Sequence, residues 1–279
     1  MRITSATNTR TAKASLINFV AGESNTPILF SKFKYRLLML LNSFVFDYLV
    51  RLRCGGLTLD YHFLKDIPVV KSNEIPKIIL IPISRLSIPH IRFSIDWMYI
   101  RSMFPFLNDS TWKSFWAITP HERLRINCVL DAIVAELYKL DYEDYTWILK
   151  EDTSDPKGFW RIDKDKPIEL RKTTLTLQAF KRLKEVGLDA FCKEDWQFPK
   201  EIQEKLGPRF LPWQLGGTPE ESWEECKQHA KNILGEEKYK QFIDDLNNPE
   251  KDIETRSFSD KNNENKKLQK SIFSWGDKK

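Results

Sequence analysis

The segment from residue 37 to residue 70 restricts what this chain can fold into more than any other part of the sequence. In its first half, apolar side chains recur at the three-to-four spacing of a buried helix, until the pair Gly55 and Gly56 breaks the pattern. After the glycines, apolar and polar residues alternate up to Pro68, which predicts a short strand. The residues at helical spacing are Leu37, Leu41, Phe44, Val45, Tyr48 and Leu52, and those at strand spacing are Leu57, Leu59, Tyr61 and Phe63.

Side chains that donate hydrogen bonds gather around the turn between this helix and this strand. Guanidinium, ammonium, imidazole and hydroxyl groups are suited to contacts with the phosphates and base edges of nucleic acid. The residues that carry them are Arg51, Arg53, Thr58, His62 and Lys65. The turn is therefore our first candidate for a nucleic-acid contact.

The charge of the chain is unevenly distributed along its length. The net charge of all 279 residues is +5, whereas residues 1–59 hold eight basic and two acidic residues and so carry +6. A basic region of this kind favours a polyanion as partner, because phosphates that are neutralised release their counterions. A basic surface that is merely solvated is the alternative, and composition alone leaves it open.

Four groups of residues along the chain form recognisable motifs. The first two are Arg2, Ile3, Ala6, Thr7, Asn8, Arg10 and Thr11, and Leu41, Asn42, Ser43, Phe46, Asp47, Tyr48, Gly55, Gly56, Leu59, Leu64, Lys65, Pro68 and Val69. The two later ones are Glu122, Arg123, Leu130, Asp131, Ala132, Ala135, Leu137, Tyr138, Leu140, Tyr145, Ile148 and Leu149, and Arg171, Lys172, Leu177, Ala179 and Phe180. These motifs resemble those of the Eco57I-type adenine-specific DNA methyltransferases, which occur in type IIG restriction-modification enzymes and related phage-defence systems. Leu57 and Thr58 stand where the family tends to have Thr-His, and Thr9 replaces an acidic residue.

The resemblance covers about residues 1 to 180 and corresponds to the C-terminal portion of a much larger family member. It implies a role in recognising double-stranded DNA, and it adds Asn8, Arg10, Thr11, Gly55 and Gly56 to the candidate DNA-binding residues. For Asn8 and Arg10, bracing of the recognition fold is an equal alternative. A complete enzyme of this family would transfer a methyl group from S-adenosylmethionine to adenine N6.

Two motifs that the chemistry requires are absent from this sequence. No Gly-x-Gly occurs to approach the cofactor, and the only Asn-Pro, at residues 248–249, is followed by Glu250 where the family has Pro and an aromatic. We therefore expect no catalytic residue, metal or cofactor in this chain, and a separate polypeptide that carries the methyltransferase catalytic domain. The alternative is a structural or interaction remnant of a split gene without DNA binding. An enzyme active by itself is the third hypothesis.

In the rest of the chain, the sequence patterns predict mainly helices. Thr119, Pro120 and Glu122 form the pattern of a capping box before a helix over residues 123–140, and His121 beside Glu122 fits this cap better than an acid-base pair. Further helices are expected over residues 142–149, 171–186, 219–235 and 236–246, with a strand over residues 77–81. The many aromatic residues between 91 and 116 indicate core packing rather than base stacking, because no regular pattern of basic residues accompanies them.

Together these patterns predict an α+β protein. Its regions are a target-recognition-type mixed α/β subdomain over residues 1–90, a mainly helical region over residues 91–246, and a disordered tail over residues 247–279. The four cysteines have no metal-type spacing and no close pair, which favours reduced thiols in the cytoplasm. The longest apolar run, about 14 residues, falls short of the roughly 20 that cross a bilayer, and no signal peptide is present, so no membrane role is expected.

Overall fold

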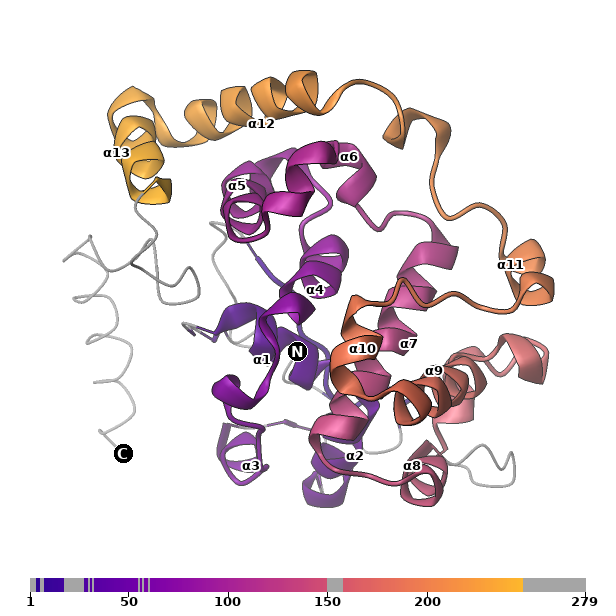
Figure 1. The fold of residues 1–279 in the computed structure, drawn as a ribbon. Coiled ribbons are helices and arrows are strands. Elements are labelled where there is room, and N and C mark those ends of the chain that lie inside the picture. Colours follow the sequence, from indigo (N-terminus) through magenta and orange to yellow (C-terminus); the bar gives the residue numbers. More distant parts are fainter. Residues whose placement is uncertain are drawn as a thin grey trace, which may run out of the picture.

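The computed structural model describes residues 4–5, 8–17, 28–29, 31, 33–54, 56, 58–59, 61–149 and 158–247 (Figure 1). Within these ranges the chain forms thirteen α-helices, joined by short 3-10 helices, and no β-strand. The predicted α+β class, with its mixed α/β target-recognition subdomain, is therefore wrong, and the described part is all-α. Gly55 and almost all of the predicted tail, residues 248–279, lie outside the described residues.

The helices follow one another with short connections. The α-helices are α1 (Lys34–Leu41), α2 (Phe44–Arg53), α3 (Tyr61–Lys65), α4 (Leu80–Ser87), α5 (Ser94–Met103), α6 (Trp112–Phe115), α7 (Pro120–Leu137), α8 (Tyr142–Leu149), α9 (Lys172–Val186), α10 (Leu188–Lys193), α11 (Lys200–Leu206), α12 (Pro219–Leu234) and α13 (Glu236–Leu246). The 3-10 helices are η1 (Ser72–Glu74), η2 (Lys77–Ile79), η3 (Ile91–Phe93), η4 (Pro105–Asp109), η5 (Phe159–Asp163), η6 (Ile168–Leu170) and η7 (Pro212–Gln214).

The segment predicted as one helix and a strand consists of three helices. Ser43 separates α1 from α2, because its side chain accepts a hydrogen bond from the Phe46 N–H and so caps α2. The strand expected after the glycines is instead α3. Phe63 in α3 packs against a small buried cluster that includes Leu59 before the helix and Ile67 after it, and the three residues are spaced four apart, as on one face of a helix. A run of a few residues is too short for its period to decide between helix and strand.

The second predicted strand, over residues 77–81, is also wrong. These residues form η2 and the start of α4, and Ile79, Leu80 and Ile83 are buried on one side. Pro82 falls in the first turn of α4, where a backbone N–H has no partner within the helix, so the proline does not interrupt it.

The helical predictions for the later part of the chain are confirmed. α7 begins with Pro120 after Thr119, and α8 and α13 span the predicted residues. α9 is followed by Gly187, which ends the helix. Its φ of 82° is a backbone conformation that residues other than glycine rarely adopt. In α12, Thr218 and Glu221 form a capping box in which each side chain accepts a hydrogen bond from the backbone of the other.

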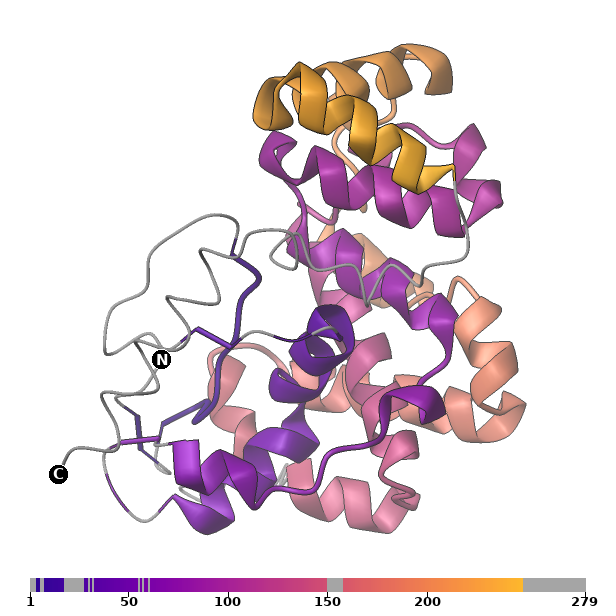
Figure 2. The ribbon, with the colours of Figure 1, turned by 90° about the vertical axis from the view of Figure 1, so that its left-hand side faces the viewer.

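The main hydrophobic core extends from α1 to α13, with α7 and α9 packed along each other inside it (Figure 1). Of the aromatic residues between 91 and 116, Trp97 and Trp112 are among the most deeply buried side chains, as expected for core packing. α12 and α13 cover α5 at one end of the molecule, whereas α2 and α3 lie at the other end (Figure 2). The core crosses residue 90 without a break, and the division into subdomains stays a prediction.

Among the described residues, no helix combines the length and the apolar character that crossing a membrane requires.

Candidate nucleic-acid interface

Residues 8–17 lie against α1 and α2 without regular secondary structure, and two polar side chains hold them there. The backbone N–H groups of Thr11 and Ala12 donate to Asp47 Oδ1 at 2.8 and 2.6 Å. Asn42 accepts from the Ala14 N–H and donates to the Ala14 carbonyl, both at 3.0 Å. These side chains therefore supply the hydrogen-bond partners that Thr11, Ala12 and Ala14 would otherwise find in a sheet.

Two of the predicted DNA-binding arginines, Arg10 and Arg51, are part of this arrangement. Arg51 Nε lies 3.1 Å from Asp47 Oδ2, and its Nη2 donates to the Thr9 carbonyl at 2.7 Å. Arg10 Nη2 donates to the Asn42 carbonyl at 2.6 Å, and its Nε lies 3.7 Å from Asp47 Oδ1. Both arginine side chains are about 90% buried, with exposed fractions of 11% for Arg10 and 10% for Arg51. Their geometry is that of residues that brace the fold.

A second buried carboxylate, that of Asp131 in α7, joins the segments further along the chain. Its Oδ1 accepts from the Phe44 N–H at the start of α2 at 2.9 Å, and its Oδ2 lies 2.6 Å from Lys172 Nζ in α9. The hydroxyl of Tyr145 in α8 donates to the Asp131 carbonyl at 3.2 Å. Asp131 therefore connects α7 with its neighbour α8 and with α2 and α9, which are far from it in the sequence.

The other predicted site residues divide into buried and exposed ones. Thr11 is buried and its hydroxyl donates to the Ser5 carbonyl at 3.2 Å. The exposed ones are Asn8, Arg53, Gly56, Thr58 and Lys65. Arg53 ends α2, Gly56 and Thr58 follow it, and Lys65 ends α3. Asn8 is held near the end of α2 because Arg51 Nη2 donates to its carbonyl at 3.0 Å. His62 lies in α3, but its side chain, like Gly55, is outside the described residues.

Sequence reasoning missed a cluster of three arginines around Glu122. The carboxylate is fully buried and receives Arg85 Nη1 at 2.7 Å, Arg125 Nη2 at 2.7 Å and Arg209 Nε at 2.7 Å. Only half of the predicted capping box forms. The Thr119 side chain accepts from the Glu122 N–H at 3.2 Å, while the carboxylate turns to the arginines.

Two carboxylates, Glu122 and Asp195, offset most of the charge of the three arginines in this cluster. Burial by itself would raise the pKa of the Glu122 carboxyl, but the hydrogen bonds from Arg125 and Arg209, with the charge of Arg85, lower it to about 2. Asp195, which is largely exposed, adds a second carboxylate at 3.0 Å from Arg125 Nη1. The cluster ties α4, α7 and the segment around Arg209 together. No spacing in the sequence could have revealed it, since Arg209 is 87 residues from Glu122.

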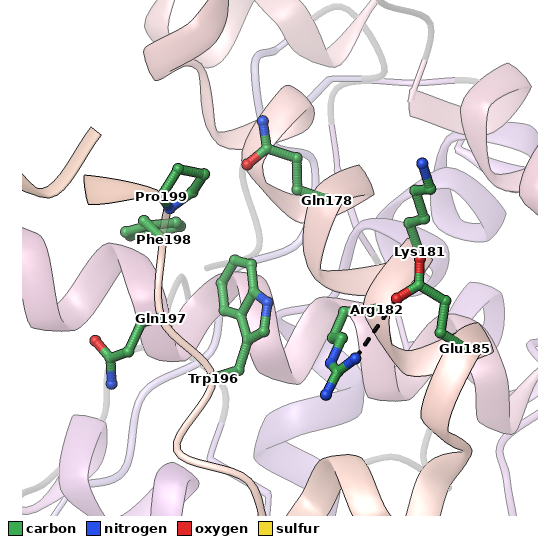
Figure 3. Close-up of a pocket in the computed structure, with 8 residues that line it drawn as sticks. All are labelled: Gln178, Lys181, Arg182, Glu185, Trp196, Gln197, Phe198 and Pro199. Carbon is green, nitrogen blue, oxygen red and sulfur yellow. Dashed lines mark ion pairs between the residues drawn. The ribbon is translucent and has the colours of Figure 1, made fainter. Parts of the chain in front are cut away.

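A hollow of about 410 Å³ lies between α9 and the extended segment at residues 196–199 (Figure 3). The residues that line it include the buried rings of Trp196 and Phe198 and the basic side chains of Lys181 and Arg182. Arg182 is paired with Glu194 at 3.2 Å and with Glu185 at 3.6 Å, so its charge is compensated within the protein. Within the described part of the chain, no group of His, Cys, Asp and Glu residues has the arrangement of a metal site.

Comparison with known proteins gives no relative: no family model, no curated protein and no solved structure matches this chain.

Proposed function

We propose that this chain is a DNA-recognition module of an adenine-N6 methylation system, and that a separate polypeptide in the same cytoplasm supplies the methyl-transfer chemistry. One observation carries the proposal. The motifs that resemble the Eco57I-type methyltransferases, although far apart in the sequence, meet at the two buried carboxylates of Asp47 and Asp131. Residues that hold the framework of a protein family together are expected in buried hydrogen-bond networks such as these two.

The exposed polar residues near the end of α2 are the proposed DNA contacts. Arg53 and Lys65 are exposed cations suited to phosphates, and Asn8 and Thr58 are exposed groups suited to phosphates or base edges. Arg10 and Arg51 act indirectly in this proposal: they fix the N-terminal segment against α2 and so position Asn8. Phosphate contacts set the register of a protein on DNA, whereas base contacts give it sequence specificity.

S-adenosylmethionine belongs to the other polypeptide in this proposal. When bound there, it supplies the methyl group. The residues of the present chain bind and orient the duplex, so that the target adenine is presented in the correct register. The chain alone is then expected to incorporate no label from S-adenosylmethionine into DNA.

The experiment measures the affinity of the full chain for duplex DNA at several salt concentrations. If the module contacts phosphates, the logarithm of affinity falls linearly with the logarithm of salt concentration. The double variant Arg53→Gln/Lys65→Gln should reduce that slope by about 2, since each lost phosphate contact removes about one released counterion. The matched control is Lys238→Gln/Lys240→Gln, which removes two exposed charges from α13 at the opposite end of the molecule.

A second candidate function is an interaction module without DNA binding. The observation that favours it is the burial of Arg10 and Arg51, because both guanidinium groups are occupied by carboxylate and carbonyl oxygens of the protein. This alternative is selected if the chain does not bind duplex DNA at low salt. It is also selected if the two double variants weaken duplex binding equally.

A further inference from the structure

The short turn at residues 211–215, which contains η7, is held in place by the buried side chain of Gln214. Gln214 is fully buried, and its Nε2 donates to the carbonyls of Lys113 and Trp116 at 3.0 and 2.8 Å. Its Oε1 accepts from the Leu211 N–H at 3.0 Å, and its own carbonyl accepts from the Thr111 hydroxyl at 3.4 Å. A buried amide with all these partners fixes the turn in one conformation.

The same turn displays large apolar side chains on its outer side. Trp213 is 50% exposed and Leu215 is 62% exposed, on either side of the buried Gln214. The Trp213 ring also rests edge-on against Trp116, with ring centres 6.4 Å apart. An exposed tryptophan on a rigid support is typical of binding hot spots, because little conformational entropy is lost when a partner covers it.

The charges beside this turn restrict what can cover it. Glu220 and Glu221 are exposed at the start of α12, five and six residues after Leu215, and Arg101 is close enough to interact with the charge of Glu220. The basic residue of α6, Lys113, is already paired with Glu225 at 2.8 Å. An acidic border repels the phosphates of a nucleic acid, and it repels an identical border on a second copy of the chain.

We propose that this turn is a docking surface for a cationic, apolar segment of another polypeptide. The apolar side chains of that segment would cover Trp213 and Leu215, and its lysine or arginine side chains would face Glu220 and Glu221. In Figure 1 the turn lies on the connection between α11 and α12, away from α2 and α3. The proposal is therefore independent of the DNA contacts proposed above.

The test uses the full chain and three synthetic helical peptides. The first alternates leucine and lysine in an amphipathic pattern, the second replaces lysine by glutamate, and the third replaces leucine by serine. The first peptide should bind and change the tryptophan fluorescence, while the other two should not. Trp213→Ala/Leu215→Ser should weaken binding about tenfold or more. Glu220→Lys should also weaken it, because it reverses one charge of the border.

The control variant is Trp147→Ala, which removes another tryptophan, 61% exposed, from α8. It should leave peptide binding unchanged, and all variants should unfold at denaturant concentrations close to that of the original chain. The proposal is overturned if the leucine-lysine peptide does not bind, if the glutamate peptide binds equally well, or if Trp147→Ala weakens binding as much as the changes at the turn. Sedimentation in which the chain self-associates through Trp213 would also overturn it.

Discussion

Arg51 forms an ion pair with Asp47, one helical turn earlier on α2, with 3.1 Å between Nε and Oδ2 and the carboxylate fully buried. A buried charge is costly unless its hydrogen-bonding capacity is satisfied. Asp47 meets this condition because it also accepts the backbone N–H groups of Thr11 and Ala12. The pair therefore connects the N-terminal segment to the helices, and it explains why this segment needs no sheet.

Asp47→Asn should destabilise the protein strongly. It leaves the buried guanidinium groups of Arg10 and Arg51 without their counter-charge, a change that costs about 3–5 kcal/mol in proteins. The control is Glu236→Gln, which breaks the exposed pair with Lys231 and should cost less than about 1 kcal/mol. Denaturant unfolding measures both. Equal losses in the two variants would contradict the role given to Asp47.

The Glu122 cluster predicts a loss of stability in acid. Burial alone would raise the pKa of this carboxyl, but its arginine partners lower it to about 2, below the value of about 4.3 in an unfolded chain. A depressed pKa stabilises the fold above the unfolded value, and that stability is lost as the pH falls through the folded value. The expected loss between about pH 4.5 and pH 2 is on the order of 3 kcal/mol.

Stability of the original chain and of Glu122→Gln, measured across this range, checks the assignment. The variant should be less stable at neutral pH, because three arginines then lack their shared carboxylate, and it should lose less stability on acidification. An identical pH dependence in both proteins would mean that other carboxyls cause the effect.

Gly187→Ala should destabilise the end of α9. At φ 82° and ψ 160° this residue occupies a region that is essentially restricted to glycine, and a side chain there costs about 1–3 kcal/mol. Nothing lies within 4 Å of an added Cβ, so the cost arises from the backbone and not from a clash. Gly216→Ala, at a position without positive φ, should change stability by less than about 1 kcal/mol. Thermal or denaturant unfolding distinguishes the two.

The cysteines should react slowly while the protein is folded. Burial raises the pKa of the Cys128 thiol to about 12 and that of Cys192 to about 11, and the thiolate is the reactive form. Cys192 is only partly buried, so it should be alkylated before Cys128 and Cys226. Peptide mapping by mass spectrometry over time, with and without denaturant, measures this order. Rapid labelling of Cys128 in the folded protein would contradict its burial.

Local sequence patterns determined the helices of the later part of the chain. α8, α9, α12 and α13 begin and end at signals that act within a few residues, such as the capping box at Thr218 and the glycine at residue 187. The apolar faces of these helices are long enough for their period to be read. The burial of Trp97 and Trp112 was predicted on a different ground, because no regular pattern of basic residues accompanies the aromatic ones.

Only the tertiary structure decided the rest. Whether residues around Leu59 and Ile79 formed strands or helices depended on which surfaces they met, because runs this short satisfy both periods. Whether a basic side chain binds a partner or braces the fold depended on a carboxylate reaching it from elsewhere, as Asp47 reaches Arg10 and Glu122 reaches Arg209. Such pairs join residues far apart in the chain, and a sequence records residue types but not the distances between them.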